Sequence, residues 1–473
     1  MVKVAILGLD SMPPAYFFGK YRADMPNLGR LMSQSLCARL ESTNPPITVP
    51  AWTSMMSSKD PGQLGFYGFR NRKDHSYDGY QFANATLIKE PLTWDILGRH
   101  GKKSLLVGVP QTYPPRPIEG AMVTCFLTPS TKSDYTYPRE LKAEVERVAG
   151  GYVLDVDDFR TSDKAELLKR IYDKTRKHFA VGRHLLRTRP WDFFMLVEMG
   201  VDRIHHAFWS YADPEHHKFV PGNPYVNSLR DYYRFLDREI GELLALLPEE
   251  TIVLVVSDHG SKKMDGGICF NEWLIAEGYL ALAEKPDKPT PIGKAKIDWS
   301  RTRAWGDGGY YGRLFLNVRG REPSGTIDPA DYENVRSEIA EKIAAITDPQ
   351  GRNIGSKAYR PEEIYRVVNG VAPDLIVYFG DLDWRSVGAV GIGSIHTFEN
   401  DTGPDEANHD WHGVFTLYDP AAPRPAPDFD DLPIFRIYDV APTVLAAFGI
   451  AVPTDMIGTA RQIQASYAPI GKS

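Results

Sequence analysis

Short apolar runs that end abruptly in polar residues recur through the first half of the chain. The clearest cover residues 2–9, 104–109, 192–199 and 251–256. Continuous apolar runs without alternation are typical of strands that are buried on both faces, as in a parallel sheet. The pattern therefore predicts several central strands of one buried sheet.

Helical periodicity separates these runs. Residues 165–189 and 233–247 carry apolar side chains at a spacing of three to four, which is typical of amphipathic helices. The second of these stretches comes just before the run at 251–256. Strand, helix and strand in alternation predict an α/β fold with a doubly wound, mostly parallel sheet flanked by helices.

The stretch from residue 266 to about residue 400 differs in composition from the segments before it. It contains a segment rich in lysine and proline at 285–291, a glycine- and aromatic-rich segment at 305–311, and a predicted helix near 332–346. We predict that residues 1–265 form the first part of a catalytic core, 266–400 an inserted cap, and 401–473 the return of the chain to the core.

Composition narrows the class of protein. The 473 residues are 42% hydrophobic and 25% charged, with a formal net charge of −6, as in ordinary soluble globular proteins. No basic face for nucleic acid is evident, and no apolar run approaches the ~18 residues of a membrane span. Three widely spaced cysteines form no disulfide framework, so we expect a cytoplasmic protein without a membrane partner.

Acids and histidines follow the predicted strands. Asp10, Asp202 and the pair Asp258-His259 each come directly after a run, and ligands of open α/β sheets bind beyond the carboxyl ends of the strands. Carboxylate and imidazole ligands suit Zn2+, with Mn2+ as the harder alternative. Two such ions would form a clamp for displacement at phosphorus.

Histidines near these acids leave alternatives open. His206 lies four residues after Asp202, on one face of a helical turn, and His205 is the fallback. Late in the chain, His412 is accompanied by His409. Each of these motifs alone also fits a helix cap or a polar turn.

The segment 45–55 supplies a hydroxyl that could act as nucleophile. Thr48 lies between prolines, which restrict the backbone and hold the side chain at a turn. Thr53 and Ser54 look more like helix-face or capping hydroxyls. A threonine hydroxyl is a weak nucleophile that coordination to a dication activates.

The ordered set of motifs resembles the alkaline phosphatase superfamily, and most closely its type I phosphodiesterase/nucleotide pyrophosphatase branch. The resemblance rests on Asp10, the segment Pro-Pro-Ile-Thr-Val-Pro-Ala-Trp-Thr-Ser-Met (45–55), Asp202-x-x-x-His206, Val-Ser-Asp-His-Gly (256–260) and the late His412-Gly. Looser stretches such as 269–280 and 438–443 are similar to a microbial phosphohydrolase or phosphomutase subgroup.

The resemblance implies a two-metal site. One ion would be bound by Asp202, His206 and His412, and the other by Asp10, Asp258 and His259. Thr48 would be the nucleophile on the second ion and would form a phosphothreonine intermediate. No side chain securely matches the phosphate-gripping residue of the relatives, and Asn271 is the nearest suggestion, with Lys262 and Lys263 as further options.

These features favour a metal-dependent phosphodiesterase that hydrolyses a small-molecule phosphate ester. A phosphomonoesterase and a phosphomutase are alternatives on the same site, and a non-catalytic metal-binding protein is the alternative outside enzymology. The predicted cap contains four aromatic residues that slightly favour a phosphate ester with a bulky organic substituent, namely Trp305, Tyr310, Tyr311 and Trp384. A phosphomutase would need a positively charged, enclosing pocket, and the predicted cap contains no run of basic residues that would supply one.

Overall fold

A nine-stranded sheet forms the centre of the larger lobe. In this computed structural model, which describes residues 2–461, the strand order is β22-β2-β21-β9-β1-β8-β5-β6-β7. Five neighbouring strands, from β9 to β6, are parallel, and β21 and β7 run against them. In sequence order the strands are β1 (Val4–Leu9), β2 (Leu36–Glu41), β5 (Ser104–Val107), β6 (Gly120–Val123), β7 (Thr136–Tyr137), β8 (Phe193–Glu198), β9 (Ile252–Val256), β21 (His412–Tyr418) and β22 (Ile434–Arg436).

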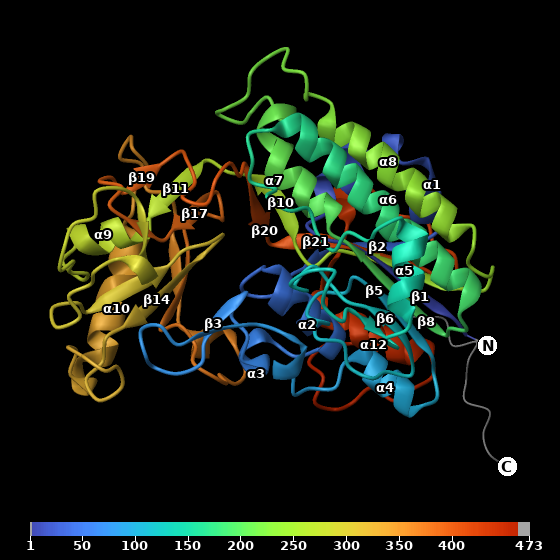
Figure 1. Cartoon of the computed structure of the whole chain (residues 1–473), viewed down its shortest axis with the longest axis horizontal. Helices are drawn as coiled ribbons and strands as arrows, with labels where there is room; N and C mark the ends of the chain where they lie inside the picture. Colours follow the sequence, from blue (N-terminus) through green and yellow to red (C-terminus); the bar gives the residue numbers. More distant parts are fainter. Residues whose placement is uncertain (1, 462–473) are drawn as a thin grey trace.

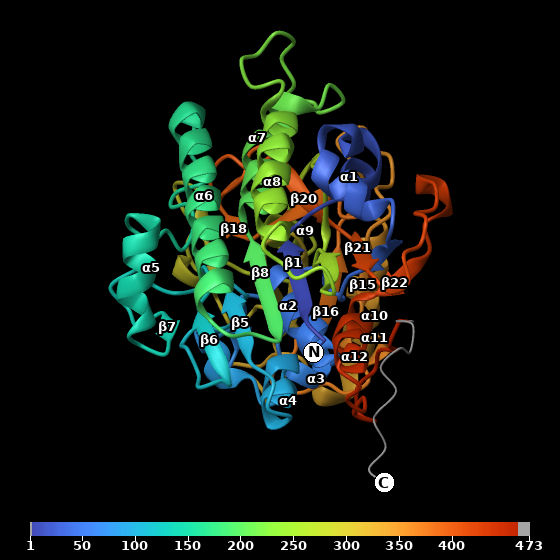
Figure 2. The ribbon, with the colours of Figure 1, turned by 90° about the vertical axis from the view of Figure 1, so that its right-hand side faces the viewer.

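Helices cover both faces of this sheet (Figures 1 and 2). One layer contains α1 (Pro26–Met32), α5 (Leu141–Ala149), α6 (Lys164–Thr188), α7 (Gly200–Ala212) and α8 (Ser228–Leu244). The other contains α2 (Thr48–Ser57), α3 (Pro61–Leu64), α4 (Thr93–Arg99) and α12 (Val440–Ala447). The predicted doubly wound, mostly parallel α/β fold is confirmed, and α6 and α8 fall on the two stretches of helical periodicity.

Strand β1 shows why its apolar run has no alternation. Ala5, Leu7 and Leu9 pack into the core beneath α6, α7 and α8, whereas Val4 and Ile6 pack into the core shared with α2 and α12. Successive side chains of a strand point to opposite faces, and helices cover both faces here. Every position of β1 is therefore buried.

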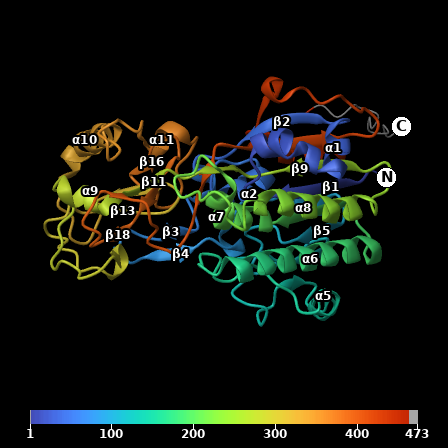
Figure 3. The ribbon, with the colours of Figure 1, turned by 90° about the horizontal axis from the view of Figure 1, so that it is seen from above.

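A second lobe lies beside the first (Figure 3). It is built on a four-stranded antiparallel sheet, β13-β14-β16-β15, and a three-stranded sheet, β17-β11-β19. The elements are β11 (Gly266–Cys269), α9 (Phe270–Ala276), β12 (Thr290–Pro291), β13 (Ala304–Asp307), β14 (Gly312–Leu316), α10 (Tyr332–Ala344), β15 (Lys357–Tyr359), α11 (Pro361–Ile364), β16 (Leu375–Tyr378), β17 (Trp384–Val387), β18 (Ala389–Val390) and β19 (His396–Thr397). We call this lobe the cap.

Two short antiparallel strand pairs lie near the junction of the lobes. β10 (Gly260–Lys263) pairs antiparallel with β20 (Ala407–Asp410), and β3 (Arg70–Arg72) pairs with β4 (Tyr80–Phe82). Figure 1 shows β3 reaching from the larger lobe toward the cap. Within the described residues, no helix combines the length and the apolar character that crossing a membrane requires.

Candidate active site

The carboxyl ends of three adjacent parallel strands bring the predicted acids together. β1 lies between β8 and β9, so Asp10 after β1, Asp202 in the first turn of α7 after β8, and Asp258 and His259 after β9 meet at one edge of the sheet. All four side chains are buried. This is the position at which open α/β sheets bind their ligands.

One group consists of Asp10, Asp258 and His259, whose ligand atoms lie within 4.8 Å of one another. Asp10 accepts a hydrogen bond from Trp52 Nε1 at 2.6 Å through Oδ2, and Asp258 accepts one from the backbone of Ser11 at 3.2 Å through Oδ1. The other oxygens, Asp10 Oδ1 and Asp258 Oδ2, have no hydrogen-bond partner. Each carboxylate therefore has one fixed oxygen and one available oxygen.

A second group consists of Asp202, His206 and His409. His206 Nε2 is 3.1 Å from Asp202 Oδ1 and accepts no hydrogen bond. The rings of His259 and His409 stack with centroids 3.8 Å apart, so the two groups are immediate neighbours.

The three histidines share one orientation. Each places Nδ1 on an oxygen: His259 on the carbonyl of Gly260 at 2.9 Å, His409 on the carbonyl of Pro46 at 2.8 Å, and His206 on Asp405 Oδ1 at 2.8 Å. When Nδ1–H donates, the lone pair is on Nε2, the usual arrangement of a metal-binding imidazole.

Both groups fit divalent cations. Burial raises the pKa of Asp10 and Asp258 well above the usual range, and mutual repulsion among the carboxylates adds to it. Buried carboxylate oxygens without partners are costly unless a cation compensates them. Carboxylates and imidazoles in groups of three are also the ligand set of catalytic zinc sites, which leave a coordination position for water or substrate.

The structure corrects the choice of the late histidine as a candidate ligand. His409, and not His412, completes the group of Asp202 and His206, because β20 pairs with β10 and places His409 opposite Ser261, next to His259. His412 instead begins β21 opposite Glu41 and is only partly buried. The two histidines are three residues apart, and only the strand pairing distinguishes them.

Thr48 is the first residue of α2, and its hydroxyl is directed at the first group. Thr48 Oγ1 lies 3.3 Å from His259 Nε2, and the side chain is buried. The preceding Ile47 is extended, which ends the proline-containing turn and starts the helix at Thr48. Thr53, by contrast, is bonded to Val49 and Gln111, in agreement with its expected helix-face role.

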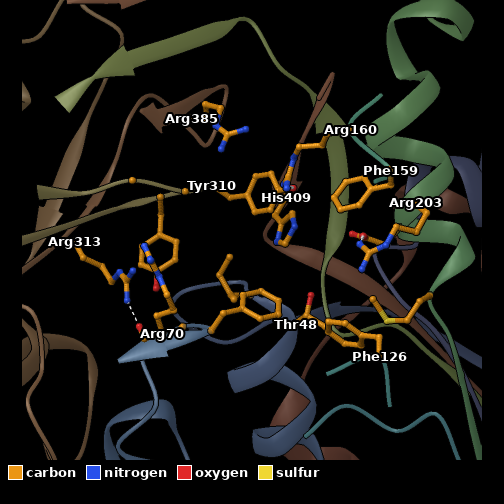
Figure 4. Close-up of a pocket in the computed structure, with 18 residues that line it drawn as sticks. Thr48, Arg70, Phe126, Phe159, Arg160, Arg203, Tyr310, Arg313, Arg385 and His409 are labelled. Carbon is orange, nitrogen blue, oxygen red and sulfur yellow. Dashed lines mark hydrogen bonds and ion pairs between the residues drawn. The ribbon is translucent and has the colours of Figure 1, made fainter. Parts of the chain in front are cut away.

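A cavity of about 320 Å³ extends from Thr48 toward the cap (Figure 4). Its walls come from both lobes and carry five arginines, namely Arg70, Arg160, Arg203, Arg313 and Arg385. Phe69, Phe126 and Phe159 supply apolar surface. Tyr310 and Tyr311 also line it, whereas Trp305 and Trp384 belong to the core of the cap. The volume is in the range of small-molecule sites.

Other predicted residues lie elsewhere. Asn271 is fully buried inside the cap, where its amide donates to the carbonyls of Gly306 and Gly388 and accepts from the backbone of Gly306. It therefore stabilises the cap and does not line the cavity, which corrects its predicted role in substrate binding. His205, the fallback ligand, is held by Ser261 and Tyr233. Lys262 and Lys263 pair with Asp383 and Asp265.

The most important residue that sequence reasoning missed is Asp405. Its buried carboxylate accepts from His206, Arg160, Tyr310 and Arg385. Burial opposes the charge, but His206 and the two arginines outweigh it and hold the pKa of Asp405 far below its usual range. The residue lies in a loop without periodicity, so no sequence signal distinguishes this buried acid from the acids of the surface.

Comparison with known proteins agrees with this fold. Among solved structures, the fold is similar to murine ectonucleotide pyrophosphatase/phosphodiesterase 5, with a TM-score of 0.56 and 12% identity over 95% of this chain and 96% of that one. It is also similar to phosphonoacetate hydrolase from Sinorhizobium meliloti 1021, with a TM-score of 0.57 and 18% identity over 88% and 90% of the two chains. No curated protein matches the sequence.

The class is thus that of the alkaline phosphatase-like α/β proteins. A model of the type I phosphodiesterase/nucleotide pyrophosphatase family matches residues 4–413, and the chain belongs to this family of phosphoester hydrolases. The family resemblance and the enzyme class inferred from the motifs are confirmed.

Proposed function

We propose that the chain is a metal-dependent phosphodiesterase that uses Thr48 as its nucleophile. The observation that carries the proposal is the position of Thr48 Oγ1, which is 3.3 Å from His259 Nε2 at the floor of the cavity. The hydroxyl thus lies beside two groups of buried ligands, in which Asp10 Oδ1, Asp258 Oδ2 and His206 Nε2 have no hydrogen-bond partner.

Asp10, Asp258 and His259 would hold one divalent ion and Asp202, His206 and His409 the other, with Zn2+ favoured by the histidine content. Bound there, the ions would supply Lewis-acid charge to the phosphate oxygens and lower the pKa of the hydroxyl and of water. A second candidate metal is Mn2+.

The proposed reaction has two steps. Thr48 Oγ1 attacks phosphorus and its proton passes to solvent, while the bond to the leaving group breaks in line and the departing alkoxide takes up a proton, which gives an ester of phosphate on Thr48. The positive end of α2 begins at Thr48 and favours the negative phosphate oxygens. Water then displaces Thr48 in a second in-line step and restores the hydroxyl.

The cavity supports a diester over a monoester. A diester needs room for a second organic group, and the cavity extends from Thr48 toward the cap on one side and to Phe126 and Phe159 on the other. Murine ectonucleotide pyrophosphatase/phosphodiesterase 5 is inactive when one threonine is replaced by alanine, and that form has been solved in complex with AMP. The inactive form of this similar protein supports the choice of a threonine as the nucleophile.

The test compares turnover of bis-p-nitrophenyl phosphate and p-nitrophenyl phosphate at pH 8 by protein reloaded with Zn2+ or Mn2+. We expect a higher kcat/KM on the diester, and a higher value on the monoester would replace the proposal by a phosphomonoesterase. Thr48→Ala should lose turnover and keep its metal. Thr53→Ala, the same change one turn along α2, should keep both.

A further inference from the structure

The cap end of the cavity has more positive charge than its carboxylates neutralise. Five guanidinium groups line the cavity, and two of them are fully occupied. Arg203 pairs with Asp155 at 2.6 Å and also with Asp202, and Arg313 pairs with Asp307 at 3.1 Å. These two arginines are structural.

Arg160 and Arg385 share a single carboxylate. Asp405 Oδ2 accepts from Arg160 Nε at 3.0 Å, and Arg385 Nη1 reaches the same oxygen only at 3.4 Å. Because this carboxylate also accepts from His206 and Tyr310, its charge is divided among four cationic or donor groups. One positive charge of the arginine pair is therefore left over.

Arg385 is the least satisfied of these groups. Its side chain is 4% exposed, and Nε has no hydrogen-bond partner. Buried guanidinium donors without acceptors are costly, and Arg385 comes from β17 of the cap with its guanidinium 5.4 Å from the Tyr310 ring. Figure 4 shows Tyr310 and His409 between Arg385 and Thr48 in that view.

Arg70 adds a second uncompensated charge. It is exposed at the start of β3 and lines the cavity, and no carboxylate pairs with it among residues 2–461. In Figure 4, Arg385 and Arg70 approach the cavity from opposite sides. The phenylalanines Phe126 and Phe159 lie at the other end, beside Arg203.

We propose that Arg385 and Arg70 form a subsite for a second anionic group, so that the substrate is a phosphate ester whose organic part carries a carboxylate or a further phosphate. The inference rests on the proposed function, because it places the reacting phosphate at Thr48. Two metal groups and the helix start already serve that phosphate. Arg385 of the cap and Arg70 of β3 therefore remain for another anion, which guanidinium groups bind through paired, charge-assisted hydrogen bonds.

The test uses diesters with one common leaving group. The compounds are p-nitrophenyl 2-carboxyethyl phosphate, its uncharged analogue p-nitrophenyl 2-carbamoylethyl phosphate, and p-nitrophenyl 2-phosphonooxyethyl phosphate. We expect kcat/KM for at least one anionic ester to exceed that of the carbamoyl ester by about 10- to 100-fold. If the ratio to the carbamoyl ester is larger for the carboxyethyl ester, the subsite binds a carboxylate; if it is larger for the phosphonooxyethyl ester, the subsite binds a phosphate.

Variants locate the effect. Arg385→Gln and Arg70→Gln should each reduce the ratio of kcat/KM on the anionic ester to kcat/KM on the uncharged ester toward one. Arg385 is buried and its substitution can harm folding, whereas Arg70 is exposed, so Arg70→Gln tests the subsite in either case. Arg319→Gln is the matched control, since Arg319 is an exposed arginine of the cap that pairs with Asp328. It should keep the wild-type ratio.

The outcomes separate the two proposals. Hydrolysis of all three esters at equal kcat/KM would overturn the subsite and leave the phosphodiesterase intact. If no ester is hydrolysed, the proposed function fails, and calorimetry with 2-carboxyethylphosphonate and 2-carbamoylethylphosphonate decides the subsite alone. Tighter binding of the carboxylate compound that is lost in Arg385→Gln supports the subsite, and equal binding overturns it.

Discussion

Asp405 offers a sharp test of whether the second group binds metal, because it contacts His206, a proposed ligand, without belonging to the group itself. Its Oδ1 accepts from His206 Nδ1 at 2.8 Å, while Oδ2 accepts from Arg160 and Tyr310. Asp405→Asn keeps the shape and removes the charge that fixes the His206 tautomer and makes Nε2 more basic. Loss of such a partner typically weakens metal binding about 10- to 100-fold.

The structure sets the expected size of the effect. The carbonyl of Ala407 also lies 3.1 Å from His206 Nδ1, so part of the orientation survives in the variant. We therefore expect the lower end of the range, an increase of about tenfold in the Kd of the weaker Zn2+ site. Competition titration against a chromophoric chelator measures both sites.

Asp374→Asn is the matched control. Asp374 is also a buried aspartate that accepts from an arginine and a tyrosine, here Arg321 and Tyr332, but it lies in the cap without contact to a histidine. Unchanged Zn2+ affinity in Asp405→Asn would refute the reasoning. An equal loss in Asp374→Asn would assign the effect to general destabilisation.

Three further predictions follow from the packing and the buried charges. Gly8→Ala should lower the free energy of unfolding in urea by about 1–3 kcal/mol, because the added Cβ would lie 2.5 Å from the ring of Trp52, whose Nε1 donates to Asp10. Gly19→Ala is the control, since a Cβ there meets no atom within 4 Å and should change the free energy little. Burial opposes the charge of Glu198, but Lys174 and His178 outweigh it and lower the pKa of Glu198 from 4.5 to about 2. The ionised Glu198 therefore stabilises the folded state above pH 4.5, and this stabilisation is lost as the pH falls toward 2. The stability difference between wild type and Glu198→Gln, about 3 kcal/mol from this shift, should narrow over that window, and a constant difference would contradict the shift. Removal of metal by a chelator should lower the Tm at pH 8, because Asp10 and Asp258 lose their compensating charge; an unchanged Tm in scanning calorimetry would argue against bound ions.

The sequence predicts the parts of the site that are attached to regular elements. Asp10, Asp202, Asp258 and His259 follow buried strands whose apolar runs are visible, and parallel strands bring their carboxyl ends to one edge. The same logic places His206 one turn after Asp202. These residues could be found because strand ends and helical turns impose their positions.

The remaining parts depend on long-range pairing. Whether His409 or His412 faces the metal groups is decided by the register of β20 on β10, which leaves no local pattern. The arginines of the cavity are similar, since Arg70, Arg160 and Arg385 are far apart in sequence and converge only after the cap has folded. A search for runs of basic residues could not detect a cluster of this kind.

Covalent attachment of Thr48 to phosphorus is the decisive step of the proposed reaction. The most direct measurement is acid quenching of metal-loaded protein during turnover of bis-p-nitrophenyl phosphate, followed by digestion and mass spectrometry. We predict release of one p-nitrophenolate and a p-nitrophenylphosphoryl group on Thr48, absent in Thr48→Ala, which binds metal but does not turn over. An adduct on another residue, or full turnover by Thr48→Ala, would contradict the account.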